Sequence, residues 1–459
     1  MRFTIASFLL GLLTTSTTFG RQNQFLGSVP TGVPSSTPLA LTLHDAIDRG
    51  LRTNLGLLIS DSANETVRGE RLRALSALLP QIDSRVSETV EQRNLQTVGF
   101  NFHVPGISIP IIAGPFHYTD VRAAASWTVF DYSARKNYSV SKENRRAAQF
   151  SVQNARDLVV QATVNGYLLI IADASRVEAI RSQVETSQAL YDRAVDQENA
   201  GTAAGIDVLR AQVELKQQQQ RLLAQSNEFE KDKLTLGRVI GLPGGQDFNT
   251  SETAPFAPLA SMTQDQALQT AIQQRPDLQS YKAHLRAAEE AVKAARGQRY
   301  PTAEVTGDYG DVGTTLGNSH GTFSFVASAK ITVFDGGRIA SDVIQAKSAL
   351  KQRQDELADL GGQIEYQVRS AFLDIRSAGD QVAVAQDNLS LANQTLVQAR
   401  DRFSAGVTDN IEVVQAQESV AAANDTLISA LYAHNIAKVA LARALGGAED
   451  GIRKLLEVK

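Results

Sequence analysis

The chain has 459 residues, of which 43% are hydrophobic and 20% are charged, and its formal net charge is −4. This composition supports a folded core and argues against wholesale disorder, while the near-neutral charge gives no sign of a nucleic-acid-binding surface. Because the chain has no cysteine, a disulfide scaffold, a thiolate zinc site, a cysteine nucleophile and a lipidated N-terminal cysteine are excluded.

Residues 1–20 have the layout of a secretory signal peptide. Arg2 supplies a positive charge, residues 3–13 are mostly apolar, and residues 14–20 are small and polar. The apolar run is too short to anchor the chain in a bilayer; the alternative is a buried helix at the start of the fold. Residues 21–40 contain three prolines and are expected to form a flexible leader. No later segment is expected to span a membrane as a helix.

The sequence repeats itself at an offset of about 205 residues. The matching segments are 200–212 with 405–417, and 127–131 with 331–335. The first repeat is therefore placed at 41–243 and the second at 262–447, with a linker at 244–261 and a C-terminal tail at 448–459. Each repeat is expected to contain two helices, a strand, a loop, a strand, a very long helix, a tight turn and a long helix.

Four segments alternate between apolar and polar residues with a period of two, which predicts β-strands. They lie at about 81–91, 119–130, 302–310 and 322–333. Each has the length of a tilted strand that crosses a bilayer, with one face for lipid and one for water. The alternative is a half-buried sheet of a soluble protein. Four strands in a bilayer leave two unpaired edges, so the chain is expected to oligomerise into a closed barrel.

Four long helices are predicted, at about 133–200, 206–240, 338–404 and 411–446. In the second repeat, apolar residues recur every three or four positions, which predicts a left-handed coiled-coil seam. The seam consists of Val368, Ala371, Ile375, Ala378, Val382, Ala385, Leu389, Ala392, Leu396, Ala399 and Phe403, then Val413, Ala416, Val420, Ala423, Leu427, Ala430, His434, Ala437 and Leu441. His434 interrupts it and is interpreted as a packing residue. A helix over 338–404 would be about 100 Å long, too long for a compact globular domain.

The turn between the last two helices has a recognisable sequence. Gly406 stands where a helix should stop in a left-handed conformation. Asp409 followed by Glu412 resembles a capping box that starts the next helix. The two helices are therefore expected to form a hairpin.

Four motifs, by their order and their duplication, resemble those of the outer-membrane efflux protein (TolC-like) family. They are Leu43-His44-Asp45-Ala46-Ile47 before Thr53-Asn54; Gln266-Ala267-Leu268 through Arg275-Pro276-Asp277-Leu278; Phe334-Asp335-Gly336-Gly337-Arg338; and Arg402-Phe403-Ser404-Ala405-Gly406 with Ile411-Glu412-Val413-Val414-Gln415-Ala416. The resemblance implies a mainly α fold with a small transmembrane β part. The duplicated strand–strand–helical-hairpin unit would form a trimeric, twelve-stranded β-barrel continued by a long α-helical barrel.

The resemblance also implies a function and a location. The protein would be the exit duct of a tripartite efflux or secretion system, placed in the outer membrane and extending into the periplasm. It would passively export small molecules or proteins, with a periplasmic adaptor (membrane fusion) protein, an inner-membrane pump of the RND or ABC type and outer-membrane lipid as partners. No enzymatic activity, cofactor, metal site or nucleic-acid partner is expected. The alternative is a structural coiled-coil protein of the periplasm.

In the family, acidic residues at the helical tips form a cation-sensitive ring that closes the channel. The resemblance assigns this gate to Glu412 and Asp207, with Gln415 where the family often has a second acid and with Asp409 nearby. Three copies of Glu412 around one axis would repel one another and attract cations. The alternative is that these carboxylates only stabilise helix N-termini, by ~0.3–1 kcal/mol each.

The turn residues are candidate contacts for the adaptor, again by resemblance. They are Gly201, Thr202, Gly205, Gly406, Val407 and Thr408. Their alternative role is to form the turns. The loop at 92–117 is unusually apolar and is expected either to fold over the barrel mouth or to contact a partner. His103, His117 and His320 lie in the loops without a metal-ligand spacing, so no metal site is expected there.

Overall fold

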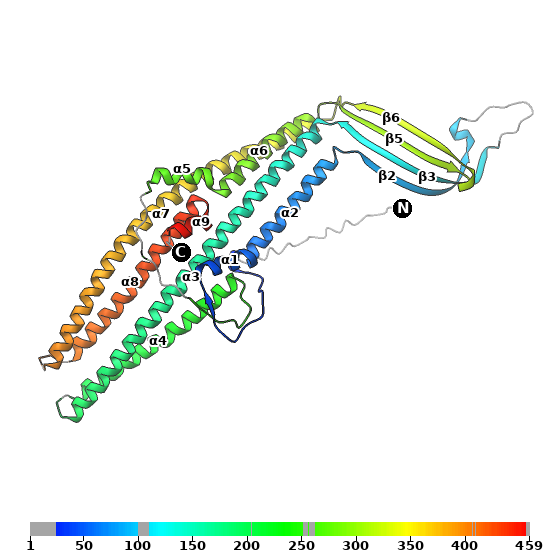
Figure 1. The fold of residues 1–459 in the computed structure, drawn as a ribbon. Helices are drawn as coiled ribbons and strands as arrows, with labels where there is room; N and C mark the ends of the chain where they lie inside the picture. Colours follow the sequence, from blue (N-terminus) through cyan, green and yellow to red (C-terminus); the bar gives the residue numbers. More distant parts are fainter. Residues whose placement is uncertain are drawn as a thin grey trace, which may run out of the picture. The chain divides into compact units, whose positions relative to one another are not determined.

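The computed structural model describes residues 24–99, 110–202, 204–250, 256, 262–405, 407–408 and 410–455. The chain divides into two compact units. The hairpin unit consists of Met1–Ile59, Asn154–Gln274 and Glu365–Lys459, and the strand unit consists of Ser60–Gln153 and Arg275–Ile364. Two long helices, α3 (Tyr132–Asn199) and α7 (Arg338–Ser404), contribute residues to both units (Figure 1). The predicted signal peptide lies outside the described residues.

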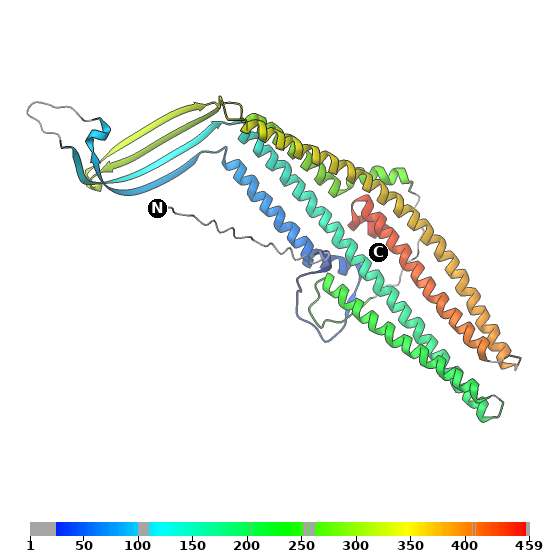
Figure 2. The same cartoon turned by 180° about the vertical axis from the view of Figure 1, so that it is seen from behind.

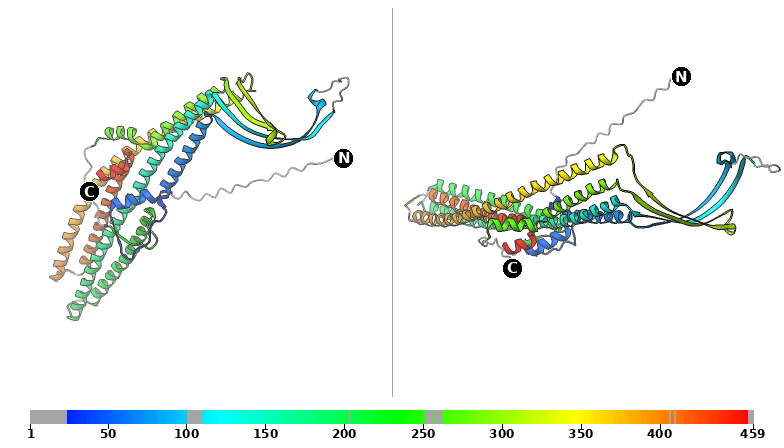
Figure 3. Two further views of the ribbon diagram at one scale, coloured as in Figure 1. Left: turned by 45° about the vertical axis from the view of Figure 1, so that its right-hand side comes forward. Right: turned by 90° about the horizontal axis from the view of Figure 1, so that it is seen from above.

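The strand unit contains one antiparallel sheet in the order β2-β3-β5-β6 (Figure 1). Its strands are β2 (Gln81–Asn94), β3 (Ile112–Phe130), β5 (Thr302–Gly313) and β6 (Ser319–Lys330), with the short 3-10 helices η2 (Leu95–Val98) and η3 (Leu316–Asn318) beyond them. The sheet is visibly curved and twisted when seen from two further directions (Figure 3).

The register of the sheet confirms the predicted alternation. One row of opposed residues is Ile82, Ala125, Gly307 and Phe325, and the adjacent row is Asp83, Ala124, Asp308 and Ser324. The first row belongs to a face that is mainly apolar, with a polar group of Glu88, His117 and Thr119 further along β2 and β3, and its residues Ile82 and Phe325 are 77% and 70% exposed. A face of large exposed apolar side chains has no partner within this chain, which is what contact with lipid requires.

The polar face of the sheet is held together by one arginine. Arg122 on β3 donates to Asp120, to Asp308 on β5 and, from Nη2 at 3.0 Å, to Thr322 on β6. It reaches β6 by crossing β5 at Gly310, where an added Cβ would lie 2.6 Å from the carbonyl oxygen of Val121. A polar network of this kind fixes the register of three strands on the water-facing side.

Three strand predictions needed correction. β3 has an irregularity between Thr128 and Phe130, so that Phe130, rather than Val129, continues the apolar face opposite Ala303. The fourth strand was expected to reach 333 but ends at Lys330, because β5 begins at Thr302 and pairs with Lys330. The β2–β3 hairpin extends further than expected, with pairing out to Asn94 and Ile112. The predicted loop at 92–117 is therefore partly strand, and its residues 100–109 lie outside the described part of the chain.

The helices of the strand unit are α2 (Leu55–Ser76), α6 (Pro276–Gly297) and the adjoining parts of α3 and α7. Two ion pairs connect α3 to α6. Lys136 Nζ lies 2.9 Å from Glu290 Oε2, and Arg286 Nε lies 2.8 Å from Glu143 Oε2.

The hairpin unit is built from α1 (Leu43–Thr53), α4 (Gly205–Val239), α5 (Gln264–Gln274), α8 (Asn410–Leu445), α9 (Ala448–Leu455) and the remaining parts of α3 and α7. α3 lies beside α4, and α7 beside α8, in two opposite views (Figures 1 and 2). Its main core contains Val160, Val164 and Tyr167 of α3 with Leu236 of α4. Tyr167 is fully buried, and its hydroxyl donates to the carbonyl of Leu41 at 3.0 Å.

The segment expected as a flexible leader is instead tied to the hairpin unit over its described part. It contains the 3-10 helix η1 (Gln24–Leu26), and the following strand β1 (Leu39–Leu41) pairs in parallel with β4 (Phe248–Thr250) of the expected linker. Backbone hydrogen bonds run from Val29 N to Thr53 O (2.9 Å) and from Thr31 N to Gly241 O (3.0 Å). Proline-rich composition did not prevent order here, because the neighbouring backbone supplies partners for its N–H groups. The expected C-terminal tail likewise contains helix α9.

Helix α3 contains an 18-residue window of mean hydropathy 1.4, long and apolar enough for a membrane span, and 56% of that window is buried. This window does not contradict the expectation that no later segment spans a membrane as a helix, because a buried core helix passes the same test of length and composition. The run that includes Val164, Tyr167 and Ile171 packs in the core of the hairpin unit, which explains its apolar character.

Candidate functional site

The two helices of the second hairpin, α7 and α8, pack together along the predicted apolar seam. Val382 and Ala385 of α7 pack against Ala430 of α8, and further along Ala392 packs against Val420 and Ala423. Close to the turn, Ala399 packs against Val413 and Ala416. Small residues alternating with larger ones allow the two helices to approach closely. His434 is buried as expected for a packing residue, and its ring lies 5.1 Å from the ring of Phe256.

The tip of the first hairpin is a tight turn between α3 and α4. Gly201 has φ of +68°, a left-handed conformation that favours glycine. Thr202 closes the turn: its N–H and its hydroxyl both donate to the carbonyl of Gln197, at 2.9 and 3.0 Å. Gly205 begins α4, and Asp207 lies in its first turn. Gly201, Thr202 and Gly205 are all exposed, so they are open to a partner while forming the turn.

The tip of the second hairpin joins α7 to α8. Gly406 and Asp409 lie outside the described residues, so the expected capping box is not part of the described structure. Val407 is 69% exposed, and its N–H donates to the carbonyl of Arg402 at 3.0 Å. Thr408 is half-buried, and Glu412 lies in the first turn of α8.

The two candidate gate carboxylates that the structure describes, Asp207 and Glu412, each have an arginine partner that was not expected from the sequence. Glu412 Oε2 lies 3.4 Å from Arg402 Nη1 across the turn, and Asp207 Oδ1 lies 3.3 Å from Arg210 Nη1 one turn along α4. Arg210 stands at spacing i, i+3 from Asp207, which was an available sequence signal, whereas Arg402 lies ten positions before Glu412, on the other side of the turn. Because the side chains of these pairs are partly exposed, the pairs are worth only ~0–1 kcal/mol and open at little cost.

A groove of about 480 Å³ runs between α4 and α8 near the tips. Its lining is mainly apolar and includes Ile206, Leu209 and Val213 of α4 and Ile411 and Val414 of α8. Gln415 also lines it, on the exposed side of α8. Asp207 and Glu412, in contrast, are not among its lining residues.

Polar residues replace the apolar seam inside the first hairpin. Glu214 and Gln218 of α4 are 5% and 2% exposed, and Gln218 Nε2 donates to Glu214 Oε1 at 2.7 Å. Ser187 of α3 and Gln417 of α8 are buried as well and line the same small cavity as Glu214.

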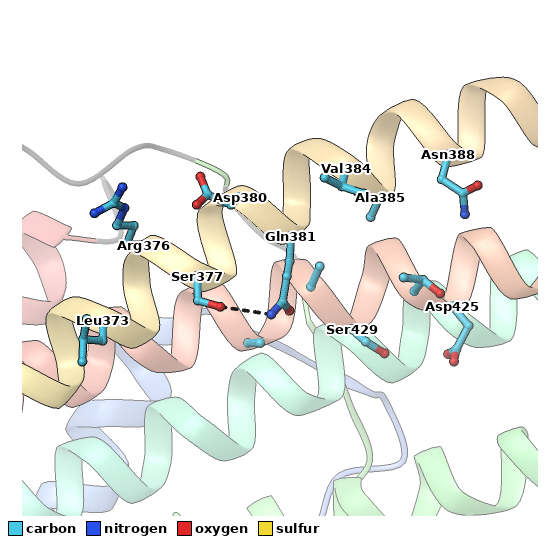
Figure 4. Close-up of a pocket in the computed structure, with 13 residues that line it drawn as sticks. Leu373, Arg376, Ser377, Asp380, Gln381, Val384, Ala385, Asn388, Asp425 and Ser429 are labelled. Carbon is cyan, nitrogen blue, oxygen red and sulfur yellow. Dashed lines mark hydrogen bonds between the residues drawn. The ribbon is translucent and has the colours of Figure 1, made fainter.

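A second groove, of about 1150 Å³, runs along α7 and α8 (Figure 4). Leu373, Ser377, Val384 and Asn388 line it from α7, and Ser429 lines it from α8. Gln381 donates to Ser377 within the groove at 3.2 Å. Leu373 and Val384 are 65% and 68% exposed, so an apolar stripe of α7 is uncovered in the single chain.

Within the described ranges, no group of three or more histidine, aspartate or glutamate side chains is placed to hold a metal ion. His117 instead pairs with Glu88, with Nδ1 at 2.8 Å from Oε1, and His320 is part of β6. His103 lies outside the described residues. The described parts of the tips present carboxylates, arginines and an apolar groove.

Both repeats match one family model, described as outer membrane efflux protein, over residues 72–242 and 267–447. The chain belongs to the outer membrane efflux protein family. It is 26% identical over 339 residues to the outer membrane protein OprJ of Pseudomonas aeruginosa, an alignment that covers 71% of this chain and 67% of OprJ. It is 23% identical to the outer membrane efflux protein BepC of Brucella suis, covering 83% of this chain and 86% of BepC.

The fold matches that of solved outer-membrane channels. The CmeC channel of Campylobacter jejuni superposes with a TM-score of 0.76 at 17% identity, covering 95% of this chain and 94% of CmeC. The resemblance drawn from the sequence motifs is thus confirmed, as are the predicted TolC-like fold and the outer-membrane location. The chain is an efflux channel of the outer membrane, not a structural rod of the periplasm.

Proposed function

We propose that three copies of this chain form the passive exit duct of a tripartite efflux system. One observation carries this proposal: within the described residues, the apolar-faced sheet has two open edges, at β2 and at β6. Unpaired backbone groups at those edges cannot remain in lipid. Three copies supply twelve strands, enough to close a transmembrane barrel with the Arg122 face toward the water-filled interior.

The helices of the hairpin unit support the same assembly. Leu223 and Leu234 of α4 are 74% and 72% exposed, and they lie 18 and 29 residues after Gly205, where α4 begins. The groove residues Leu373 and Asn388 lie 31 and 16 residues before Ser404, where α7 ends. With tips aligned, the two leucines of one copy stand at the level of the α7 groove of the next copy. We infer that this groove receives α4 of a neighbouring copy.

The gate belongs to the same proposal. Three copies of Glu412 and Asp207 would place carboxylates around the axis at the tips, with Gln415 and Asp409 next to them, and cations would bind there. The pairing of Glu412 with Arg402 within one chain gives the carboxylate an alternative partner when the ring opens. The lack of a carboxylate at Gln415 makes this ring weaker than one with two acids per chain.

The adaptor is assigned to the exposed turn residues. Gly201, Thr202, Gly205 and Val407 are uncharged residues exposed at the two turns, and the half-buried Thr408 and Gly406, which lies outside the described residues, are included in the same proposal. A periplasmic adaptor protein docking there would connect the duct to an inner-membrane pump of the RND or ABC type. The duct would export small molecules or proteins without catalysing a reaction and without a cofactor.

Paired cysteines test the assembly, and the natural absence of cysteine makes the result easy to interpret. The double variant Leu234→Cys with Leu373→Cys should form disulfides between copies in isolated outer membranes, giving a ladder up to the mass of three chains without reductant. The control pair Leu234→Cys with Leu391→Cys is offset along the helix by about 24 Å and should not cross-link. A monomer band for the first pair, or equal cross-linking of both pairs, contradicts the proposed packing.

A further inference from the structure

A buried carboxylate in the hairpin unit has an oxygen without a donor. Asp173 of α3 is 3% exposed. Its Oδ1 accepts from Arg176 Nη1 at 3.0 Å and from Gln225 Nε2 of α4 at 3.2 Å. Its Oδ2 is buried and, within the described structure, accepts no hydrogen bond. An ionised oxygen left this way is costly, so a donor with a transferable proton is expected beside it.

The neighbouring group is a second carboxyl. Asp232 of α4 is close enough to Asp173 for that carboxylate to raise its pKa, and it also lines a cavity of about 510 Å³ together with Tyr432 of α8. Two carboxyl groups hydrogen-bond to each other only when one of them carries a proton. A proton on Asp232 would give the orphaned oxygen of Asp173 its missing donor.

We propose that Asp173 and Asp232 share a single proton, and that this pair is a pH-dependent latch between the two helical hairpins. Arg176 connects this carboxyl pair to the second hairpin. Besides Asp173, it donates from Nε to Asp425 Oδ1 at 3.0 Å and from Nη2 to Ser429 Oγ at 2.9 Å, and both acceptors are on α8. One guanidinium therefore joins α3 to α8 while it holds the carboxylate that faces α4.

The groups around Asp232 determine whether the latch opens as the pH rises or as it falls. Burial, followed by the hydrogen bond and the negative charge of Asp173, raises the pKa of Asp232 to about 6. Glu228 on α4 acts in the same direction, and Lys231 on α4 opposes them. From α8 the facing group is Tyr432, whose pKa is raised by burial, so its phenol remains protonated. The groups on α3 are Asp173 and Arg176, and η1 contributes only the apolar Phe25 and Leu26 to the adjoining cavity.

Loss of the proton leaves two adjacent carboxylates on α3 and α4. Their repulsion is relieved when the helices separate or when Arg176 turns toward the new charge and releases Asp425 and Ser429. Either route weakens the contact between the hairpins. The latch is therefore closed below about pH 6 and loosened above it. Along both α3 and α4, this position is more than 20 residues from the tip of the first hairpin, so the latch is separate from the proposed gate.

Backbone hydrogen exchange of the full-length protein in detergent, corrected for the intrinsic pH dependence of exchange, tests the latch. In the wild type, exchange in 170–180, 222–234 and 423–432 should rise by about tenfold between pH 5 and pH 7.5, with a midpoint near pH 6. Asp232→Asn keeps a donor for Asp173 and should hold exchange at the low value throughout. The matched control Glu228→Gln, one turn earlier on α4, should keep the wild-type profile.

Three results would overturn the proposal. They are a flat profile in the wild type, a pH-dependent profile in Asp232→Asn, or loss of the pH dependence in Glu228→Gln. If Asp232→Asn fails to fold, infrared difference spectra of the wild type decide instead. A protonated carboxyl band that is lost with a midpoint near pH 6, together with the rise in exchange, supports the latch. The band without the rise, or the rise without the band, contradicts it.

Discussion

The two helical hairpins are copies of one plan, yet they are stabilised differently. The second hairpin, α7 with α8, is closed by an apolar seam in which Val382, Ala385 and Ala430 are all buried. The first hairpin, α3 with α4, buries Asp173, Ser187, Glu214 and Gln218 in the corresponding interior. A regular seam gives a rigid rod, whereas buried polar groups give contacts that depend on partners and protons. Among the described residues, the buried carboxylates Asp157, Asp173 and Glu214 all lie in the first hairpin, whereas the buried polar residues of α8 are Gln417, His434, Asn435 and Lys438.

The largest effect should come from placing a charge in the apolar seam. Val382 is 0% exposed and packs against α8, so Val382→Asp would bury a carboxylate without a partner. The expected loss in the free energy of unfolding is about 3–5 kcal/mol. Thermal unfolding of the purified protein, followed by circular dichroism, measures it. The variant Gln386→Asp, at an exposed neighbouring position, is the control and should change the midpoint little. Equal losses in both variants would show that burial in the seam does not cause the destabilisation.

The next effect tests the polar interior of the first hairpin. Gln218→Leu removes the donor to Glu214 and leaves a buried carboxylate oxygen unpaired, which should cost about 1–3 kcal/mol. The double variant Glu214→Leu with Gln218→Leu removes both partners and should recover most of that loss, making the first hairpin resemble the second. Denaturant unfolding of the single and double variants measures the coupling. Additive losses would mean that the two side chains do not act as a pair.

A smaller effect concerns acid stability at the base of the first hairpin. The hydrogen bond from Lys233 lowers the pKa of Asp247, and Lys233 itself is 7% exposed. A lowered pKa means that this contribution is present above pH 4 or so and is lost as the pH falls further. Because Asp247 is mostly exposed, Asp247→Ala should cost about 1 kcal/mol at most.

The same contact sets an expected pH profile. Together with the latch, which closes on acidification through pH 6, it predicts that the first hairpin is best protected between about pH 4 and pH 6. Hydrogen exchange at the end of α4 as a function of pH measures this. A protection maximum at neutral pH would contradict the sign of the latch, and undiminished protection well below pH 4 would contradict the sign of the Asp247 contact.

The smallest expected effect lies where the two repeats agree, at the turns from strand to long helix. Asp131 accepts from the N–H of Ala134 at 2.9 Å, and Asp335 accepts from those of Gly337 and Ile339 at 3.0 and 2.8 Å. The backbone N–H groups of Ile339 and Gly337 lower the pKa of Asp335. Asp335→Ala should therefore speed exchange in the first turn of α7 more than Asp131→Ala does in α3. The reverse order would contradict the hydrogen-bond count.

Strict periodicity is what made much of the fold predictable from the sequence. The heptad spacing from Val368 to Phe403 predicted α7 and its partner face, and the alternation around Ile82 and Phe325 predicted the two faces of the sheet. Features that depend on contacts distant in sequence were missed. The shift at Val129 depends on the register of β5, and the order of 24–41 depends on backbone partners at Thr53 and Gly241.

The candidate site was predictable only in part, for the same reason. The acids Asp207 and Glu412 were located by the tip motifs; the pairing of Asp207 with Arg210 follows from their i, i+3 spacing on α4, but that of Glu412 with Arg402 depends on the turn geometry. The carboxyl pair of Asp173 and Asp232 joins residues 59 positions apart on two helices, and no local pattern marks it. Periodicity locates helices and faces; it does not show which polar groups meet between them.

Single-channel conductance in planar bilayers tests the central claim most directly, with the wild type compared with Glu412→Ala while divalent cations are added. The account predicts steady conductance from assembled trimers, blocked by the cations in the wild type and less blocked in the variant. Conductance without a difference between the two proteins would keep the duct and remove Glu412 from the gate. No insertion and no conductance from either protein would contradict the duct itself.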